Sequence, residues 1–211
     1  MMKFLIVDTH PIVREGLKHL LKTEFPSCEI IETGKFSDLV NYAESVNLAA
    51  IILDINTPRR NGIETIKQVR SNGSTVPMLV ISSFAEELYA MRTLKAGANG
   101  FISKETPCKE LLYAIHKILA KGKYISTFLI EKLTDSIDEN PIKHTCNLLS
   151  DRELQVLQLI GSGKTSGEIA SEMTLSSSTI STYRTRILQK LQLNNNAELI
   201  RYAIDNNIIK N

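Results

Sequence analysis

The sequence has no apolar run long enough to cross a membrane, and it has few cysteines. None of its apolar stretches approaches the ~20 residues that a membrane-spanning helix needs, and the start, Met1-Met2-Lys3-Phe4, lacks the pattern of a secretory signal. The 3 cysteines, Cys28, Cys108 and Cys146, are far apart and odd in number, so they form neither a disulfide framework nor a metal-binding spacing. We therefore expect a reducing, cytoplasmic location and no membrane partner.

The chain also lacks a strong excess of charge of either sign. Lys and Arg number 25 and Asp and Glu number 23, which gives a formal net charge of +2 over the 211 residues. This balance excludes a polycation that coats nucleic acid with its whole surface. It does not exclude a protein that concentrates positive charge on a single helix.

Short apolar runs alternate with amphipathic stretches over about the first 122 residues. Each run is rich in Ile, Val and Leu, which is typical of a strand buried on both faces of a sheet. The runs are Phe4–Val7, Glu29–Ile31, Ala50–Leu53, Met78–Ile81 and Gly100–Ile102. Since apolar residues recur at helical spacing between them, the pattern predicts an α/β fold with a doubly wound, five-stranded parallel sheet.

The character of the sequence changes after Gly122. Residues 123–147 read as a helical extension followed by a polar linker that contains Pro141. Residues 148–211 contain no strand-like run and several helix-start signals. These signals are Ser150 with Glu153, Thr165 with Glu168, Ser176, and Asn195 with Glu198. They predict a second, all-α domain of four short helices.

Polar residues follow the predicted strands of the first domain. Asp8 and Thr9 follow the first strand, Asp54 the third, Ser82 and Ser83 the fourth, and Lys104 the fifth. In a parallel sheet the carboxyl ends of the strands meet at one edge, where ligands bind. Carboxylates are ligands for Mg²⁺, and a carboxylate can attack phosphorus to give an acyl phosphate. The arrangement therefore predicts phosphoryl transfer with help from a cation and an ammonium group.

Four segments resemble the receiver domain of two-component response regulators. They are FLIVDTHPIVREGL, AAIILDINTPRRNGIETI, VPMLVISSFAEE and KAGANGFISKETP, in order and at the family's spacing. The resemblance implies a flavodoxin-like fold and phosphorylation of Asp54 by a sensor histidine kinase. It also implies that Asp8, Asp54 and the backbone carbonyl of Asn56 hold Mg²⁺, and that Ser82, Lys104 and Phe101 form the switch that responds to the phosphoryl group.

Thr9 departs from this family pattern. The family has a second acidic residue at this position, and that acid is usually the one in direct contact with the metal. A hydroxyl there removes one negative charge, so we expect weaker Mg²⁺ binding and slower phosphorylation of Asp54. A regulator that is partly independent of phosphorylation is the alternative that this substitution suggests.

Residues 161–165 imitate the end of a nucleotide-binding loop. The full motif requires Gly at the position of Gln158, and it requires a preceding strand where a capped helix is predicted. An ATPase is therefore excluded, and we expect a protein that is not an enzyme.

The third predicted helix of the second domain, 177–191, carries three cations and no acid. On a helical wheel one side is apolar, and the other carries small hydroxyls and charges that suit base edges and phosphates. The run from Leu149 to Leu193 resembles the LuxR-type helix-turn-helix, and the resemblance covers about Leu148 to Asn206. The whole chain therefore resembles the NarL/FixJ class of response regulators, closest in motif to the branch typified by BvgA and EvgA. The resemblance places Ser181, Thr182 and Thr185 in the DNA groove and Arg184, Arg186 and Lys190 near the backbone.

These observations predict a DNA-binding transcriptional regulator. Phosphorylation of Asp54 would gate the formation of a homodimer, which binds double-stranded promoter DNA through two recognition helices. Two alternatives remain. In one, the receiver mainly mediates dimerisation, without a phosphorylation switch; in the other, the helical domain binds a protein instead of DNA.

Overall fold

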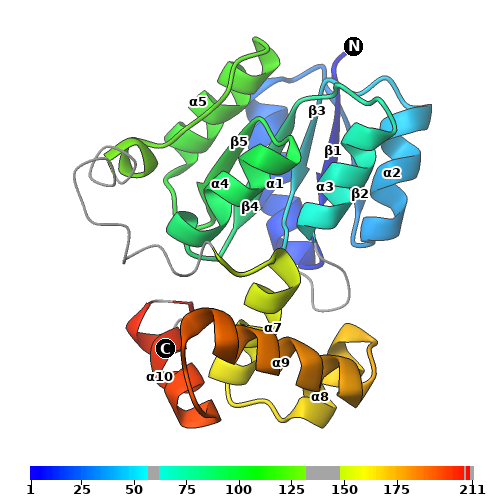
Figure 1. Cartoon of the computed structure of the whole chain (residues 1–211). Helices are drawn as coiled ribbons and strands as arrows, with labels where there is room; N and C mark the ends of the chain where they lie inside the picture. Colours follow the sequence, from blue (N-terminus) through cyan, green and yellow to red (C-terminus); the bar gives the residue numbers. More distant parts are fainter. Residues whose placement is uncertain (57–61, 132–147, 207, 210–211) are drawn as a thin grey trace. The chain divides into compact units, whose positions relative to one another are not determined.

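The computed structural model describes residues 1–56, 62–131, 148–206 and 208–209, and the chain divides into two compact units (Figure 1). The first unit is Met1–Glu131 and the second is Lys132–Asn211. Pro141 and Cys146, which the sequence singled out, lie outside the described residues.

The first unit contains a five-stranded parallel sheet with the strand order β2-β1-β3-β4-β5. The strands are β1 (Lys3–Val7), β2 (Glu29–Thr33), β3 (Ala50–Leu53), β4 (Met78–Ser82) and β5 (Gly100–Ser103). The helices are α1 (Pro11–Glu24), α2 (Phe36–Ser45), α3 (Gly62–Ser71), α4 (Glu86–Ala96) and α5 (Cys108–Leu119). The predicted doubly wound sheet is confirmed.

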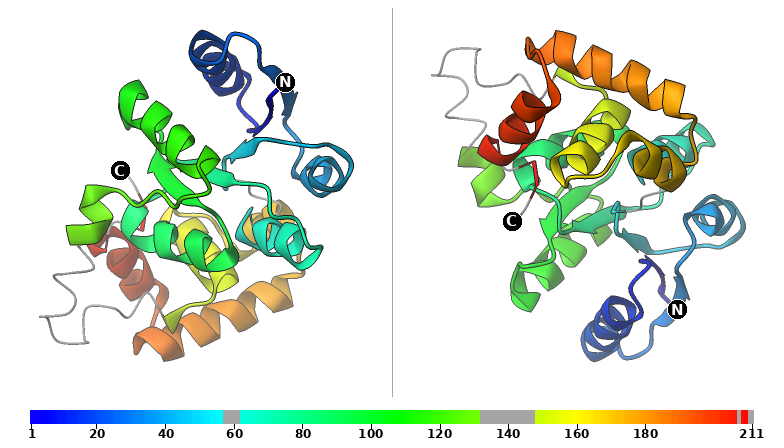
Figure 2. Two further views of the ribbon diagram at one scale, coloured as in Figure 1. Left: turned by 90° about the horizontal axis from the view of Figure 1, so that it is seen from above. Right: turned by 90° about the horizontal axis from the view of Figure 1, so that it is seen from below.

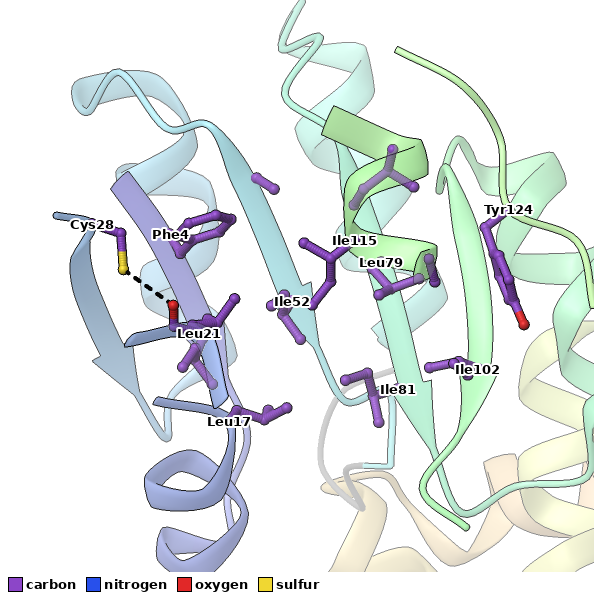
Figure 3. Close-up of a cluster of buried hydrophobic side chains, with 14 residues drawn as sticks. Phe4, Leu17, Leu21, Cys28, Ile52, Leu79, Ile81, Ile102, Ile115 and Tyr124 are labelled. Atoms are coloured by element: carbon purple, nitrogen blue, oxygen red, sulfur yellow. Dashed lines mark hydrogen bonds between the residues drawn. The ribbon is translucent and has the colours of Figure 1, made fainter. Parts of the chain in front are cut away.

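Helices cover both faces of this sheet. α1 and α5 lie on one face, and α2, α3 and α4 lie on the other (Figures 1 and 2). Successive strand residues point to opposite faces, so Phe4, Ile52 and Leu79 all pack toward α1 and α5. There they meet Leu21 and Ile115 in a buried cluster (Figure 3). This burial on both faces explains why the strands read as unbroken apolar runs.

The strand register brings the carboxyl ends of four strands together. Val7 of β1 pairs with Leu53 of β3, and Leu53 pairs with Val80 of β4. Ser82 of β4 pairs with Ser103 of β5. Residues that directly follow β1, β3 and β5 therefore share one edge of the sheet, and the end of β4 lies beside them.

The second unit consists of four helices in its described part. They are α7 (Asp151–Gly161), α8 (Ser166–Met173), α9 (Ser177–Leu191) and α10 (Asn196–Asp205). Ser150 with Glu153 and Thr165 with Glu168 form the predicted capping boxes, and the side chains of Ser176 and Asn195 cap α9 and α10. Each cap accepts a backbone N–H that the first turn of a helix leaves unpaired.

A buried apolar core joins these helices. α7 packs against α9 and α10, and α8 packs against α9. Leu154 and Leu157 of α7 and Ile180 and Ile187 of α9 are completely buried. Lys164 lies in the turn between α7 and α8 and pairs with Glu172, as expected for a turn residue outside any nucleotide-binding loop. Among the described helices, none has the length and apolar character to span a bilayer.

Candidate functional site

Two buried carboxylates and one ammonium group meet at the carboxyl edge of the sheet. Asp8 follows β1 and Asp54 follows β3, and each is only 2% exposed. The Nζ of Lys104, which follows β5, donates to Oδ2 of Asp8 and to Oδ2 of Asp54, both at 2.7 Å. The remaining Oδ1 of Asp54 accepts the backbone N–H of Asn56 at 2.9 Å. The parallel topology thus joins residues that are far apart in sequence.

The pocket changes the protonation of its groups. Burial raises the pKa of Asp54, although the hydrogen bonds from Lys104 and Asn56 act in the opposite direction. Burial alone would lower the pKa of Lys104, but the hydrogen bonds to Asp54 and Asp8 outweigh it and the pKa is raised. Lys104 therefore stays charged at neutral pH. Because the pKa of Asp54 is raised, keeping its carboxylate ionised in the folded protein costs folding free energy.

Ser82 and Phe101 lie inside the fold. Ser82 is fully buried at the end of β4, and its Oγ accepts the backbone N–H of Phe84 at 3.1 Å. Phe101 is 1% exposed, and it pairs in register with Val80 of β4, so both point to the face opposite the α1–α5 cluster. The role of these residues as a switch stays a prediction.

Thr9 is exposed, and its neighbour His10 reaches the pocket instead. The backbone N–H of His10 donates to Oδ1 of Asp8 at 2.7 Å, and its ring Nδ1 lies 2.9 Å from the same oxygen. Sequence reasoning missed His10. The spacing Asp-x-His, with Pro11 at the start of α1, was the available signal, because the bend before a helix can turn both side chains to one side.

Arg14 is a second residue that the sequence did not single out. Its Nη1 donates to the backbone carbonyl of Asp8 at 2.8 Å, and its side chain is only 19% exposed. The contact joins α1 to the loop that follows β1 and fixes the backbone that carries the Asp8 carboxylate. Its signal was weak, since an Arg in the second turn of an amphipathic helix usually faces solvent.

The described part of the chain contains one group of residues able to hold a metal ion. Ligand atoms of Asp8, His10 and Asp54 lie within 4.8 Å of one another. The two carboxylates and the Asn56 carbonyl are oxygen donors of the kind that Mg²⁺ requires, so these residues fit the ion. The fit lacks the third carboxylate, because Thr9 offers only a hydroxyl.

The segment after α5 returns to the edge strand β5. Tyr124 forms a β-bridge with Gly100 of β5, and its hydroxyl donates to Oε1 of Glu110 at 2.5 Å. The hydroxyl of Ser126 donates to Glu86 at the start of α4. Burial raises the pKa of Glu86, with further contributions from nearby Glu residues. The chain that leads to the second unit is thus hydrogen-bonded to α4 and α5.

Helix α9 has the predicted two-sided character. Ile180, Ile187 and Leu191 are buried. Ser181, Thr182, Thr185 and Arg186 are exposed. The three hydroxyls donate to carbonyls one turn back in α9, each at 3.0 Å. Their oxygen lone pairs therefore remain available to an incoming donor.

Two of the three cations on α9 are engaged within the second unit. Arg184 donates through Nε to Oδ1 of Asn196. Lys190 lies 2.6 Å from Oε2 of Glu153, which is 3% exposed. Within the part of the chain that the structure describes, Arg186 makes no such ion pair. DNA contact by all three cations stays a prediction, and Arg186 is the cation most available for it.

The Glu153–Lys190 pair should make the second unit sensitive to acid. Burial would raise the pKa of Glu153, but the hydrogen bonds from Lys190 and Ser150 lower it below its ordinary 4.5. A lowered pKa contributes stability that is present above 4.5 and is lost as pH falls through the folded-state value. We expect Glu153→Gln to lower the free energy of unfolding at pH 7 by ~1 kcal/mol and to flatten its acid dependence.

Urea denaturation of the full chain at a series of pH values, followed by circular dichroism, measures this effect. Glu198→Gln, which changes a half-buried carboxylate at the corresponding position of α10, is the control and should stay close to the original chain. Equal acid dependence in the Glu153→Gln chain and the original would contradict the assignment.

Comparisons with known proteins agree with this geometry. A family model described as "Response regulator receiver domain" matches residues 4–116, and one described as "Bacterial regulatory proteins, luxR family" matches residues 147–203. The "Virulence factors putative positive transcription regulator BvgA" of Bordetella pertussis is 34% identical, with 98% of each chain covered. The "Fimbriae Z protein" of Escherichia coli K12 is 33% identical, with 94% of each covered. A solved structure of RcsB from Salmonella enterica serovar Typhimurium, bound to a promoter with phosphomimetic BeF₃⁻, is 25% identical, with a TM-score of 0.68 over 95% of this chain and 97% of that one.

Proposed function

Because this chain belongs to the two-component response regulators that join a receiver to a LuxR-type DNA-binding domain, we propose that phosphorylation of Asp54 gates its dimerisation and its binding to promoter DNA. A sensor histidine kinase would supply the phosphoryl group. The single observation that carries this proposal is the buried Asp8–Asp54–Lys104 arrangement at the carboxyl edge of the sheet. The protein acts in this proposal as a regulator rather than an enzyme, in the cytoplasm.

Asp54 is the group in this pocket suited to attack phosphorus. Its Oδ1 and Oδ2 are fixed by Asn56 and Lys104, so the carboxylate is held in one orientation. Asp8, Asp54 and the Asn56 carbonyl would hold Mg²⁺, which neutralises charge on the phosphoryl oxygens. Lys104 already lies beside Asp54 and can pair with the new oxygens, and Ser82 at the end of β4 can donate to them.

The phosphorylated side chain carries about −1.5 to −2 charges, in place of the single negative charge of the Asp54 carboxylate. Movement of Ser82 and Lys104 toward this charge would act on β4 and β5, and therefore on Phe101 and on the start of α4. Glu86 at the start of α4 binds Ser126, and Glu110 of α5 binds Tyr124, both in the segment that leads toward the second unit. This chain of contacts offers a physical route from the phosphoryl group to the linker.

The recognition helix supports DNA as the partner. Ser181, Thr182 and Thr185 are small and exposed, which permits close approach to base edges in the major groove. Arg186 can contact phosphate, as can Arg184 and Lys190 if they leave their present partners. A homodimer would place two such helices on half-sites about one DNA turn apart. The solved RcsB structure, which is bound to a promoter, is consistent with this use of the fold.

We also propose the domain boundaries that the sequence predicts. The receiver would end near residue 122, residues 123–147 would form a helical extension and linker, and residues 148–211 would form the DNA-binding domain. The family matches at 4–116 and 147–203 support these limits. So does the start of the described helices of the second unit at Asp151.

The test is DNA binding by the full chain with and without a small phosphodonor, for the original sequence and for Asp54→Asn. The DNA is a fragment that the chain selects from a random library. We expect phosphorylation to raise the affinity by about 10-fold or more and the variant to show no response. Identical binding in all four cases would instead support the alternative that Thr9 suggests, a phosphorylation-independent regulator.

A further inference from the structure

His10 contacts Asp8 in the acidic pocket. The preceding residue, Thr9, stands where the family pattern has a second carboxylate. We propose that His10 is the third side-chain ligand of the metal in this pocket, beside Asp8 and Asp54, and that the pocket consequently favours a borderline transition ion such as Mn²⁺, Co²⁺ or Zn²⁺ more than an all-oxygen site would. This inference rests on the proposed function only in taking the pocket as a divalent-metal site. It assigns a ligand and a metal class that the phosphorylation switch does not require.

The backbone directs the His10 ring toward the pocket. His10 is the residue before α1, with φ −91° and ψ 111°, and Pro11 fixes the first helical position. Its N–H and its ring Nδ1 both meet Oδ1 of Asp8, at 2.7 Å and 2.9 Å. The ring edge is therefore already oriented toward a carboxylate oxygen, although 57% of the side chain remains exposed. Exposure on the outer side leaves a route for an ion and its water ligands.

Lys104 occupies only one oxygen of each carboxylate. Its ammonium binds Oδ2 of Asp8 and Oδ2 of Asp54, so Oδ1 of Asp8 remains on the side of His10. One ligand atom each from Asp8, His10 and Asp54 lies within 4.8 Å of the others. An ion with bonds of about 2.0–2.2 Å can join three such atoms after a small inward movement. Coordination through Nδ1 requires the imidazole tautomer that carries its proton on Nε2.

Charge and ligand type favour a transition ion over Mg²⁺. Asp8, Asp54 and Lys104 together carry one net negative charge, and Thr9 adds none. Mg²⁺ is a hard ion that depends on charged oxygen ligands, so it gains little from an imidazole. Transition ions bind imidazole well, and their affinities rise along the series from Mn²⁺ to Cu²⁺. Thr9 in place of an acid thus weakens Mg²⁺ binding, whereas His10 still provides an imidazole ligand for transition ions.

The experiment titrates the full chain with Co²⁺ and with Mg²⁺ by calorimetry, without phosphodonor or DNA, and follows the visible absorption of Co²⁺. His10→Ala and His10→Asn remove the ligand, and His19→Ala, at an exposed position of α1, is the matched control. We expect both His10 variants to weaken Co²⁺ by about 10-fold or more and to change its absorption, while Mg²⁺ affinity changes by less than about threefold. His19→Ala should change neither ion.

Thr9→Asp provides the complementary variant. It restores a third carboxylate, so it should raise Mg²⁺ affinity by about 10-fold or more and reduce the preference for Co²⁺. Equal weakening of both ions in the His10 variants, or an unchanged Co²⁺ spectrum, would overturn His10 as a ligand. Because binding is measured without phosphodonor and DNA, a failed phosphorylation switch would leave this result untouched, and a failed His10 assignment would leave the switch untouched.

Discussion

Asp54→Asn is expected to abolish phosphorylation of the receiver and, at the same time, to make it more stable at neutral pH. The loss of phosphorylation is complete in this prediction, because the described pocket offers no other carboxylate in the position of Asp54. Asp8 is held by Lys104, His10 and the backbone of its own turn. Intact-protein mass spectrometry after incubation with a small phosphodonor measures the gain of a phosphoryl group directly.

The gain in stability follows from the raised pKa of Asp54. A carboxyl whose folded-state pKa lies above its ordinary 3.8 favours folding most when it is protonated, and that contribution is lost as pH rises through the folded-state value. Asn carries no charge, so we expect the variant to be more stable at pH 7 by about 1–2 kcal/mol. Gains of this size are common when a substitution removes a destabilising functional group. Lys104 keeps Asp8 as its partner.

Urea denaturation between pH 3 and pH 7 (about the range in which Asp titrates) measures this difference, which should shrink toward the acid end. Glu15→Gln, at an exposed position of α1, removes one carboxylate outside the pocket and serves as the control. A variant that is less stable than the original chain at pH 7 would contradict the account, since the Lys104 contact would then outweigh the burial of Asp54.

The fold was predictable because its signals are local or periodic. The β-strands are buried on both faces and appear as continuous apolar runs, and parallel topology alone brings Asp8, Asp54 and Lys104 to one edge. Helix starts in the second unit follow from capping side chains within three residues of each other, such as Ser150 and Glu153. Strand ends were less certain, since polar Thr33 and Ser82 extend β2 and β4 beyond their apolar runs.

The contacts within the site were harder to predict. A helical wheel counts charge on α9, but it does not show that Lys190 reaches back to the buried Glu153 of α7 or that Arg184 meets Asn196. Similarly, the sequence identifies Asp8 as acidic without showing that His10 and Arg14 both contact that residue. Each of these contacts depends on the path of the backbone between elements, which a pattern of apolar and polar residues does not determine.

The second large effect concerns DNA binding by Arg186, because the other two cations of α9 already have partners within the second unit. Arg186→Ala should lower DNA affinity by about 1–3 kcal/mol, or roughly 5- to 150-fold, with little change in stability. If Arg186 contacts one phosphate, the negative slope of log K against log salt should become shallower by ~0.9 in the variant. Fluorescence anisotropy with labelled DNA at several salt concentrations measures both quantities, and Lys35→Ala, at an exposed position in the receiver, provides the control for lost charge.

Lys190→Ala is the comparison variant, because it should lower stability as well as DNA affinity. Because Lys190 pairs with a buried carboxylate, its removal should destabilise the second unit, so any loss of DNA affinity should accompany a lower unfolding midpoint. Arg186→Ala should lower DNA affinity and leave the unfolding midpoint unchanged. If Arg186→Ala bound DNA as tightly as the original chain and with the same salt slope, α9 would not approach DNA through this face. A protein partner for the helical domain would then become the better explanation.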